Sequence, residues 1–123
     1  MHLSEKAALV TGASRGVGAA TALQLVQVGC GVAINYNQSI DRAEAVAARC
    51  REEGVKAVLM QGDVAEDSAC RAMVQQAVEA FGGLDILINN AGTTRFIDFS
   101  DLDAVTDEDW ERIFAVNLKG PFQ

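Results

Sequence analysis

The sequence predicts a doubly wound α/β sheet of four parallel strands with helices on both of its faces. Three observations support this fold class. Short apolar runs alternate with amphipathic helical segments, glycines follow the helical segments, and the apolar runs lack the polar alternation of a half-exposed strand. Because right-handed crossovers bring the carboxyl ends of parallel strands to one edge, we expect a ligand site there and the strand order 3-2-1-4.

The predicted strands and helices follow one another within a single domain over residues 1–123. The strands are residues 7–10, 31–36, 55–60 and 84–89. The helices are residues 16–28, a segment between Ser39 and Gly54, and a segment from Glu66 to Phe81. Ser39 is expected to cap the second helix. A fourth helix starts after Thr106, whose side chain is expected to form a capping box with Asp109.

Composition excludes several classes of function. The net charge of −7 argues against nucleic acid and anionic membranes as partners, because both require a basic surface. No apolar run is long enough to span a membrane, and the amino terminus lacks the pattern of a signal peptide, so we expect a cytoplasmic protein. Cys30, Cys50 and Cys70 show neither disulfide nor metal-ligand spacing, so the sequence predicts buried free thiols and no metal site.

One glycine-rich stretch joins the first predicted strand to the first predicted helix, and it reads Thr11-Gly12-Ala13-Ser14-Arg15-Gly16-Val17-Gly18. Gly12 can adopt the backbone angles of a tight turn, and Gly16 allows the main chain to approach a pyrophosphate. Gly18 allows the helix to pack closely against the strand. The free N–H groups and the positive dipole of the helix then face the anion, so the stretch predicts a phosphate-binding turn.

Three further motifs follow in order: Asp63-Val64 after the third strand, Asn89-Asn90-Ala91-Gly92 after the fourth, and Asn117 in the last helix. Together with the T-G-x-x-x-G-x-G turn, they resemble the short-chain dehydrogenase/reductase family, in particular its 3-oxoacyl-carrier-protein reductase-like members. The resemblance implies a Rossmann-type doubly wound parallel sheet, here truncated after the fourth strand and part of the following helix. It also implies that family members form homo-oligomers.

The resemblance also implies roles for individual residues. Asp63 and Val64 would hold the adenine, and Asn117 would belong to a catalytic Asn-Ser-Tyr-Lys tetrad. Asn90 either lines the cofactor or only bonds to neighbouring backbone. The implied cofactor-binding residues are Gly12, Ser14, Arg15, Gly16, Val17, Gly18, Tyr36, Asn37, Asp63, Val64, Asn90, Ala91 and Gly92.

Charge at the end of the second strand predicts which cofactor binds. An acidic residue there would bind a ribose 2′-hydroxyl and repel a 2′-phosphate, but this sequence has uncharged Asn35, Tyr36 and Asn37. Arg15 can form charge-assisted bonds to a 2′-phosphate, although it can also be a simple solvated arginine. The sequence therefore favours NADP(H) over NAD(H).

The family's chemistry also requires a serine, a tyrosine and a lysine four residues after the tyrosine. The sequence has no tyrosine–lysine pair of this spacing, because its only tyrosine is Tyr36 and the residue four positions later is Ile40. The chain alone is therefore expected to be inactive. Two hypotheses remain. The chain is either the cofactor-binding half of an NADP(H)-dependent reductase for a small carbonyl or alcohol substrate, or a non-catalytic nucleotide-binding protein or oligomer partner. In the second case it would need a partner to cover its exposed sheet edge.

Overall fold

The computed structural model describes residues 2–123, and its centre is one parallel sheet. The strands are β1 (Ala7–Val10), β2 (Gly31–Tyr36), β3 (Ala57–Gln61) and β4 (Ile86–Ile88). Their order is β3-β2-β1-β4, which confirms the predicted topology. In register, Ala8 of β1 lies between Val32 of β2 and Ile86 of β4. The carboxyl ends of all four strands therefore meet at one edge of the sheet.

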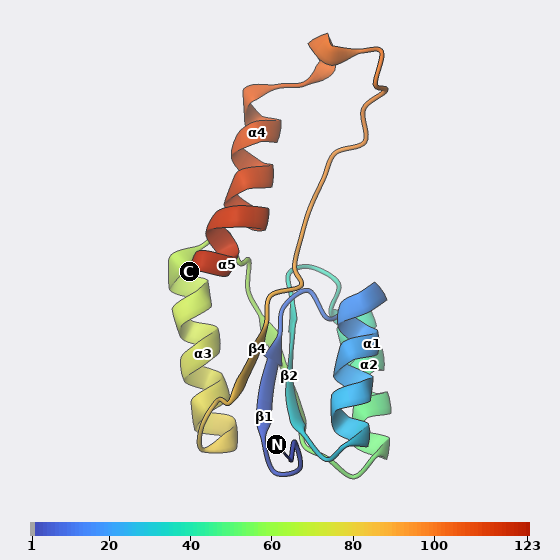
Figure 1. The fold of residues 1–123 in the computed structure, drawn as a ribbon, viewed down its shortest axis with the longest axis vertical. Helices are drawn as coiled ribbons and strands as arrows, with labels where there is room; N and C mark the ends of the chain where they lie inside the picture. The colour runs from blue at the N-terminus through green and yellow to red at the C-terminus, as the bar shows by residue number, and fades with distance from the viewer. Residues whose placement is uncertain (1) are drawn as a thin grey trace.

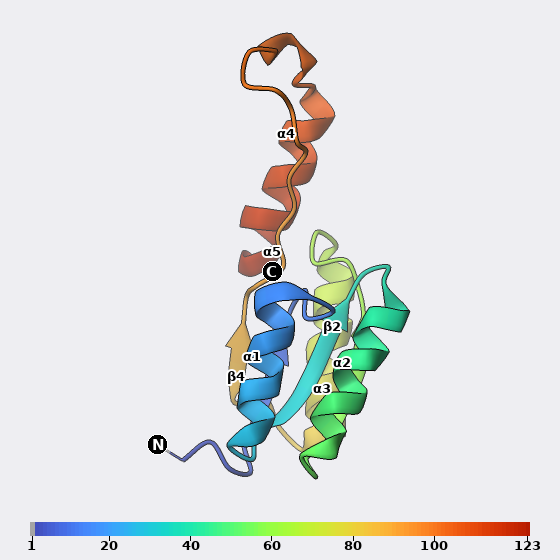
Figure 2. The same ribbon diagram turned by 90° about the vertical axis from the view of Figure 1, so that its right-hand side faces the viewer.

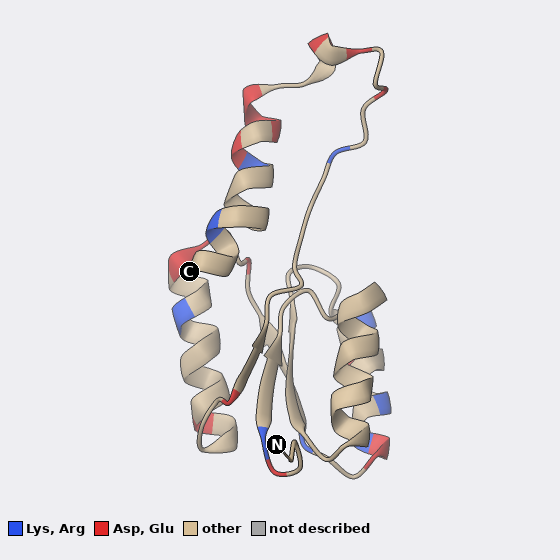
Figure 3. Ribbon diagram, viewed as in Figure 1, with Lys and Arg blue, Asp and Glu red and all other residues tan. Residues whose placement is uncertain are grey.

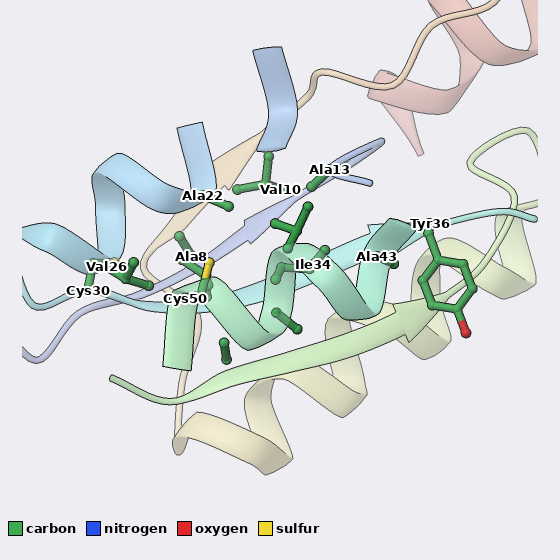
Figure 4. Close-up of a cluster of buried hydrophobic side chains, with 14 residues drawn as sticks. Ala8, Val10, Ala13, Ala22, Val26, Cys30, Ile34, Tyr36, Ala43 and Cys50 are labelled. Carbon is green, nitrogen blue, oxygen red and sulfur yellow. The ribbon is translucent and has the colours of Figure 1, made fainter. Parts of the chain in front are cut away.

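Helices cover both faces of the sheet, as the sequence predicts. Figure 1 shows α1 (Gly16–Gln27) and α2 (Ile40–Glu52) on one face and α3 (Asp67–Phe81) on the other, and Figure 2 shows the same layers from the side. Side chains of β1 alternate between the two layers. Val10 packs with the cluster under α1 and α2 that Figure 4 shows, whereas Leu9 packs with the cluster under α3.

The three cysteines are buried free thiols, which confirms the prediction. Cys30 and Cys50 belong to the cluster under α1 and α2, and Cys70 belongs to the cluster under α3. Burial raises the pKa of each thiol, so the thiols act as small apolar core residues.

Two predicted strand boundaries and one predicted helix cap need correction. β3 starts at Ala57 instead of residue 55, because the ladder with β2 begins at the Val32–Ala57 pair. β4 covers only residues 86–88 of the predicted 84–89, because it pairs with β1 alone and only along three residues. Ser39 does occupy the N-cap position of α2, but its φ of −91° and ψ of 70° lie outside the extended region, and its side chain caps nothing.

After β4 the chain leaves the sheet and forms an extension, residues 93–114, that we call the arm (Figures 1 and 2). The arm contains a loop, a short 3-10 helix η1 (Leu102–Ala104) and α4 (Asp107–Phe114). The predicted capping box of α4 is confirmed, since Thr106 Oγ1 accepts from Asp109 N–H and Asp109 Oδ2 accepts from Thr106 N–H. Figure 3 shows that acidic residues are gathered along the ribbon of the arm.

Much apolar surface is exposed on the arm and at the sheet edge. Trp110 and Phe114 stack on each other with ring centroids 5.7 Å apart, yet each remains at least half exposed. Leu87 of the edge strand β4 is 49% exposed. No helix within residues 2–123 has the length and apolar character needed to cross a membrane.

Candidate functional site

The carboxyl ends of the strands border a cleft of about 560 Å³. Its walls are the glycine turn after β1, the segments after β2 and β3, and the turn after β4. Most of the residues selected from the sequence line this cleft: Gly12, Ser14, Arg15, Gly16, Val17, Tyr36, Asn37, Asp63, Val64, Asn90, Ala91 and Gly92. Gly18 and Asn117 are not among the residues that line the cleft. Gly18 packs against the lining residues Gly12 and Asn90, and Asn117 bonds the lining residue Thr93.

The three glycines of the turn have different physical requirements. Gly12 has a φ of +61°, and a Cβ there would lie 2.8 Å from the Ala91 Cα. Gly16 has a φ of +58° and no atom within 4 Å of a Cβ position, so its backbone is open to the cleft. Gly18 packs closely, as predicted, but against the Gly12 carbonyl and the Asn90 amide rather than against the strand.

The first turn of α1 offers unsatisfied N–H donors to the cleft. Arg15 occupies the N-cap position in extended conformation, and no side chain within residues 2–123 caps the helix. The first turn also contains no acidic residue. Donor groups and a positive helix dipole therefore remain available for an anion such as a phosphate.

Asn35 lines the cleft, and from the sequence it was considered only as an uncharged position. Its side chain is 2% exposed and joins the glycine turn to the end of β3. Asn35 Oδ1 accepts from Gly12 N–H at 3.0 Å, and Nδ2 donates to the carbonyls of Met60 at 3.1 Å and Gly62 at 3.0 Å. An amide at the end of an otherwise apolar strand was the signal that could have identified it.

Thr11 and Asn90 connect the glycine turn to the segment after β4. Asn90 Nδ2 donates to the carbonyls of Thr11 at 3.0 Å and of Gly12 at 3.1 Å. Thr11 Oγ1 accepts from the backbone N–H groups of Asn90 and Ala91, both at 3.0 Å. The Asn90 amide is therefore engaged with backbone, which supports the structural one of its two predicted roles, although the residue also lines the cleft.

Charged side chains of both signs line the cleft. Arg15 is exposed and forms no ion pair with an acid in the described part of the chain. Asp63 Oδ2 accepts from Arg112 Nη1 at 2.8 Å, and Asp63 Oδ1 accepts from Ala65 N–H at 2.9 Å. Burial opposes ionisation of Asp63, but these two hydrogen bonds outweigh it and lower the pKa of the carboxyl below its ordinary value. Arg112 was not predicted as a site residue, because in the sequence it is simply one arginine in an amphipathic helix.

Asn117 lies in a π-helical turn, η2 (Ala115–Lys119), that separates α4 from the short α5 (Gly120–Phe122). The sequence predicted that Asn117 lies in the helix that starts after Thr106, and the structure shows that this wider turn interrupts that helix at Asn117. Asn117 Oδ1 accepts from Thr93 N–H at 2.7 Å, and Nδ2 donates to the Thr93 carbonyl at 2.9 Å. The side chain thus holds the start of the arm beside Gly92. Turns of this kind are frequent at functional sites.

A family model described as short chain dehydrogenase matches residues 6–123. The chain belongs to this family. Members of the short-chain dehydrogenase family are oxidoreductases that bind nicotinamide cofactors and act on small molecules. The match covers the glycine turn, the segment after β3, the turn after β4 and η2, so each wall of the cleft lies within the family's region.

Curated relatives and solved structures agree with this assignment. The chain is 44% identical over 117 residues to a 3-oxoacyl-[acyl-carrier-protein] reductase of Staphylococcus aureus strain Mu50. This match covers 95% of the chain and 46% of the reductase. The chain is also 42% identical over 121 residues to a short chain dehydrogenase of Claviceps purpurea, covering 98% of this chain and 45% of that protein.

Among solved structures, a short chain dehydrogenase from Burkholderia cenocepacia in complex with NADP superposes with a TM-score of 0.92 at 44% identity. That match covers 99% of this chain and 49% of the other. A short-chain dehydrogenase/reductase from Serratia marcescens gives a TM-score of 0.90 at 40% identity, with coverages of 99% and 49%. The chain therefore spans about half the length of the relatives that it matches.

Proposed function

We propose that this chain is the cofactor-binding half of an NADP(H)-dependent oxidoreductase that transfers hydride between nicotinamide and a small carbonyl or alcohol substrate. The charge of the cleft supports the proposal most directly. In a chain of net charge −7, the charged residues that line the cleft are Arg15, Arg112 and a single acid, Asp63. The site is therefore suited to an anionic ligand in an otherwise acidic protein.

The geometry of the cleft fits a dinucleotide in a defined orientation. The turn at Gly12 and Gly16 and the first N–H groups of α1 would hold the pyrophosphate. Asp63 and Val64 would hold the adenine, and the segment from Asn90 to Gly92 would border the nicotinamide side. NADP(H), when bound, supplies or accepts the hydride. We propose that Asn117 contributes to the proton relay of the complete enzyme, that Ser14 and Val17 complete the wall around the pyrophosphate, and that Gly18 supports this wall by packing against Gly12 and Asn90.

The preference for NADP(H) follows from the residues around the end of β2. Tyr36 and Asn37 line the cleft and carry no charge, so no acid there would repel a 2′-phosphate. Arg15 lines the same cleft and has no acidic partner among residues 2–123. The similarity to a Burkholderia cenocepacia structure in complex with NADP supports this preference.

Arg15→Ala should weaken NADPH binding by about tenfold to a hundredfold and change NADH binding by less than about threefold, because only NADPH offers the phosphate that Arg15 would bond. Dissociation constants for both cofactors, measured by the fluorescence of the bound reduced nicotinamide, test this. Arg49→Ala on the exposed surface of α2 is the matched control and should affect neither constant. Equal weakening of NADPH and NADH by Arg15→Ala would contradict the assignment.

A second candidate function is a non-catalytic nucleotide-binding protein or an oligomer partner of a full-length family member. The edge strand β4 supports it, because β4 pairs on one side only and exposes Leu87. If the chain is half of an oxidoreductase, NADPH oxidation coupled to carbonyl reduction should appear once a segment that carries the serine, tyrosine and lysine is supplied. NADPH binding that stays without oxidation even then would favour the second candidate.

A further inference from the structure

One ion pair joins the arm to the nucleotide cleft. Arg112 of α4 and Asp63 of the segment after β3 are 49 residues apart in sequence, and their side chains meet at 2.8 Å. Both residues line the cleft. A second contact also ties the arm to the cleft: the Asn117 side chain of η2 bonds the backbone of Thr93, the first residue of the arm. Arg112 therefore links α4, the helix that leads into η2, to the cleft wall formed by the segment after β3.

The carboxylate of Asp63 is fixed at both oxygens. Ala65 N–H donates to Oδ1 and the Arg112 guanidinium donates to Oδ2, which leaves further lone pairs of both oxygens free. The Asp63 side chain remains 26% exposed at the cleft wall, so a ligand can reach it. Without Arg112, the local Ala65 contact alone would hold the carboxylate, and the side chain could rotate about its own bonds.

From this geometry we propose that Arg112 is a positioning residue: it acts through Asp63, holding that carboxylate in place to accept a hydrogen bond from the adenine end of the cofactor. The inference rests on the proposed function and extends it to a residue of α4. Arg112 is not proposed to contact the cofactor's 2′-phosphate, which is the role proposed for Arg15 of the glycine turn.

The test compares single and double variants of this pair. Arg112→Ala should weaken NADPH and NADH by the same factor, about threefold to tenfold, since the pair is partly exposed and both cofactors carry the adenine. Arg112→Lys should restore most of the affinity, because one donor contacts the carboxylate. In the Asp63→Asn background, Arg112→Ala should cause no further loss.

Arg95→Ala is the matched control on the same arm. Arg95 pairs with Asp109 at 3.0 Å and its side chain is 49% exposed, against 48% for Arg112, but its partner lies on the arm itself. This variant removes the same charge without touching the cleft, so cofactor affinity should stay unchanged. Losses from Arg112→Ala that are confined to NADPH, that equal those of Arg95→Ala, or that persist in the Asp63→Asn background would overturn the inference.

A second measurement needs no cofactor. The pKa of the Asp63 carboxyl, followed by NMR, should rise in Arg112→Ala, because the guanidinium is the cation that faces this group. The other titratable side chain that interacts with Asp63 is the Cys70 thiol of α3, which carries no charge near neutral pH. An unchanged Asp63 pKa would overturn the inference. Failure of the unsubstituted protein to bind either cofactor would instead overturn the proposed function.

Discussion

Gly18→Ala should lower the free energy of unfolding by about 1–3 kcal/mol and weaken NADPH binding by at least about tenfold. A Cβ at this position would lie 2.5 Å from Asn90 Nδ2, 2.7 Å from the Gly12 carbonyl oxygen and 3.0 Å from the Ala13 Cα. Two of these neighbours are backbone atoms, which cannot move without displacing the turn. The third is an amide already bonded to Thr11 and Gly12. The methyl group would therefore deform the wall of the cleft itself.

Chemical denaturation and NADPH titration of the same samples measure both effects. Gly83→Ala is the matched control, because no atom lies within 4 Å of its Cβ position and its φ is not positive. This variant should leave unfolding and binding within experimental error of the unsubstituted protein. If Gly18→Ala behaves like Gly83→Ala, the tight packing between α1, the glycine turn and Asn90 does not determine the cleft.

The second large effect is expected at Asn35. Asn35→Ala should lower the free energy of unfolding by about 3 kcal/mol, because it removes the partner of Gly12 N–H and of the Met60 and Gly62 carbonyls. These groups lie where the glycine turn meets the end of β3. Cofactor affinity should fall as well, since the turn loses its connection to the neighbouring strand.

Asn37→Ala provides the comparison, because Asn37 is an exposed asparagine two residues further along the same segment. Its effect on unfolding should stay within about 0.5 kcal/mol. The two variants should be compared by urea denaturation at one protein concentration. Equal free energies of unfolding for Asn35→Ala and Asn37→Ala would contradict this prediction. They would show that, in the Asn35→Ala variant, water replaces Asn35 as the hydrogen-bond partner of the Gly12 N–H and of the Met60 and Gly62 carbonyls.

Periodicity and glycine placement were sufficient to predict the sheet and its helices. The strand order and the ends of β1 and β2 agree with the prediction because both strands are central and apolar on both faces. The capping box at Thr106 was predictable because its bonds lie within four residues of one another. The ends of β3 and β4 were less predictable, because pairing with a neighbouring strand sets them, and pairing is not written in the local sequence.

The parts of the site that sequence reasoning missed depend on contacts between distant segments. Asn35 of β2 bonds to Met60 of the neighbouring strand β3 and to Gly62 just after it, and Arg112 reaches Asp63 from the arm. The π-turn around Asn117 adds one wider turn to a helix whose apolar spacing is otherwise ordinary. Apolar periodicity cannot reveal such a turn, because a π-helical turn is defined by its i→i+5 backbone hydrogen bonds and not by the spacing of apolar side chains.

Amide NMR spectra recorded during titration with NADPH test the central claim most directly. We expect the resonances of Gly12, Gly16 and Gly18 to shift with a saturable dependence on NADPH concentration, together with those of Asp63 and Gly92. The resonances of the glycines at the other ends of the helices should not shift; these glycines are Gly29, Gly54 and Gly82. Shifts centred on that second group, or no shift at millimolar NADPH, would contradict the assignment of this cleft as the site of NADP(H) binding.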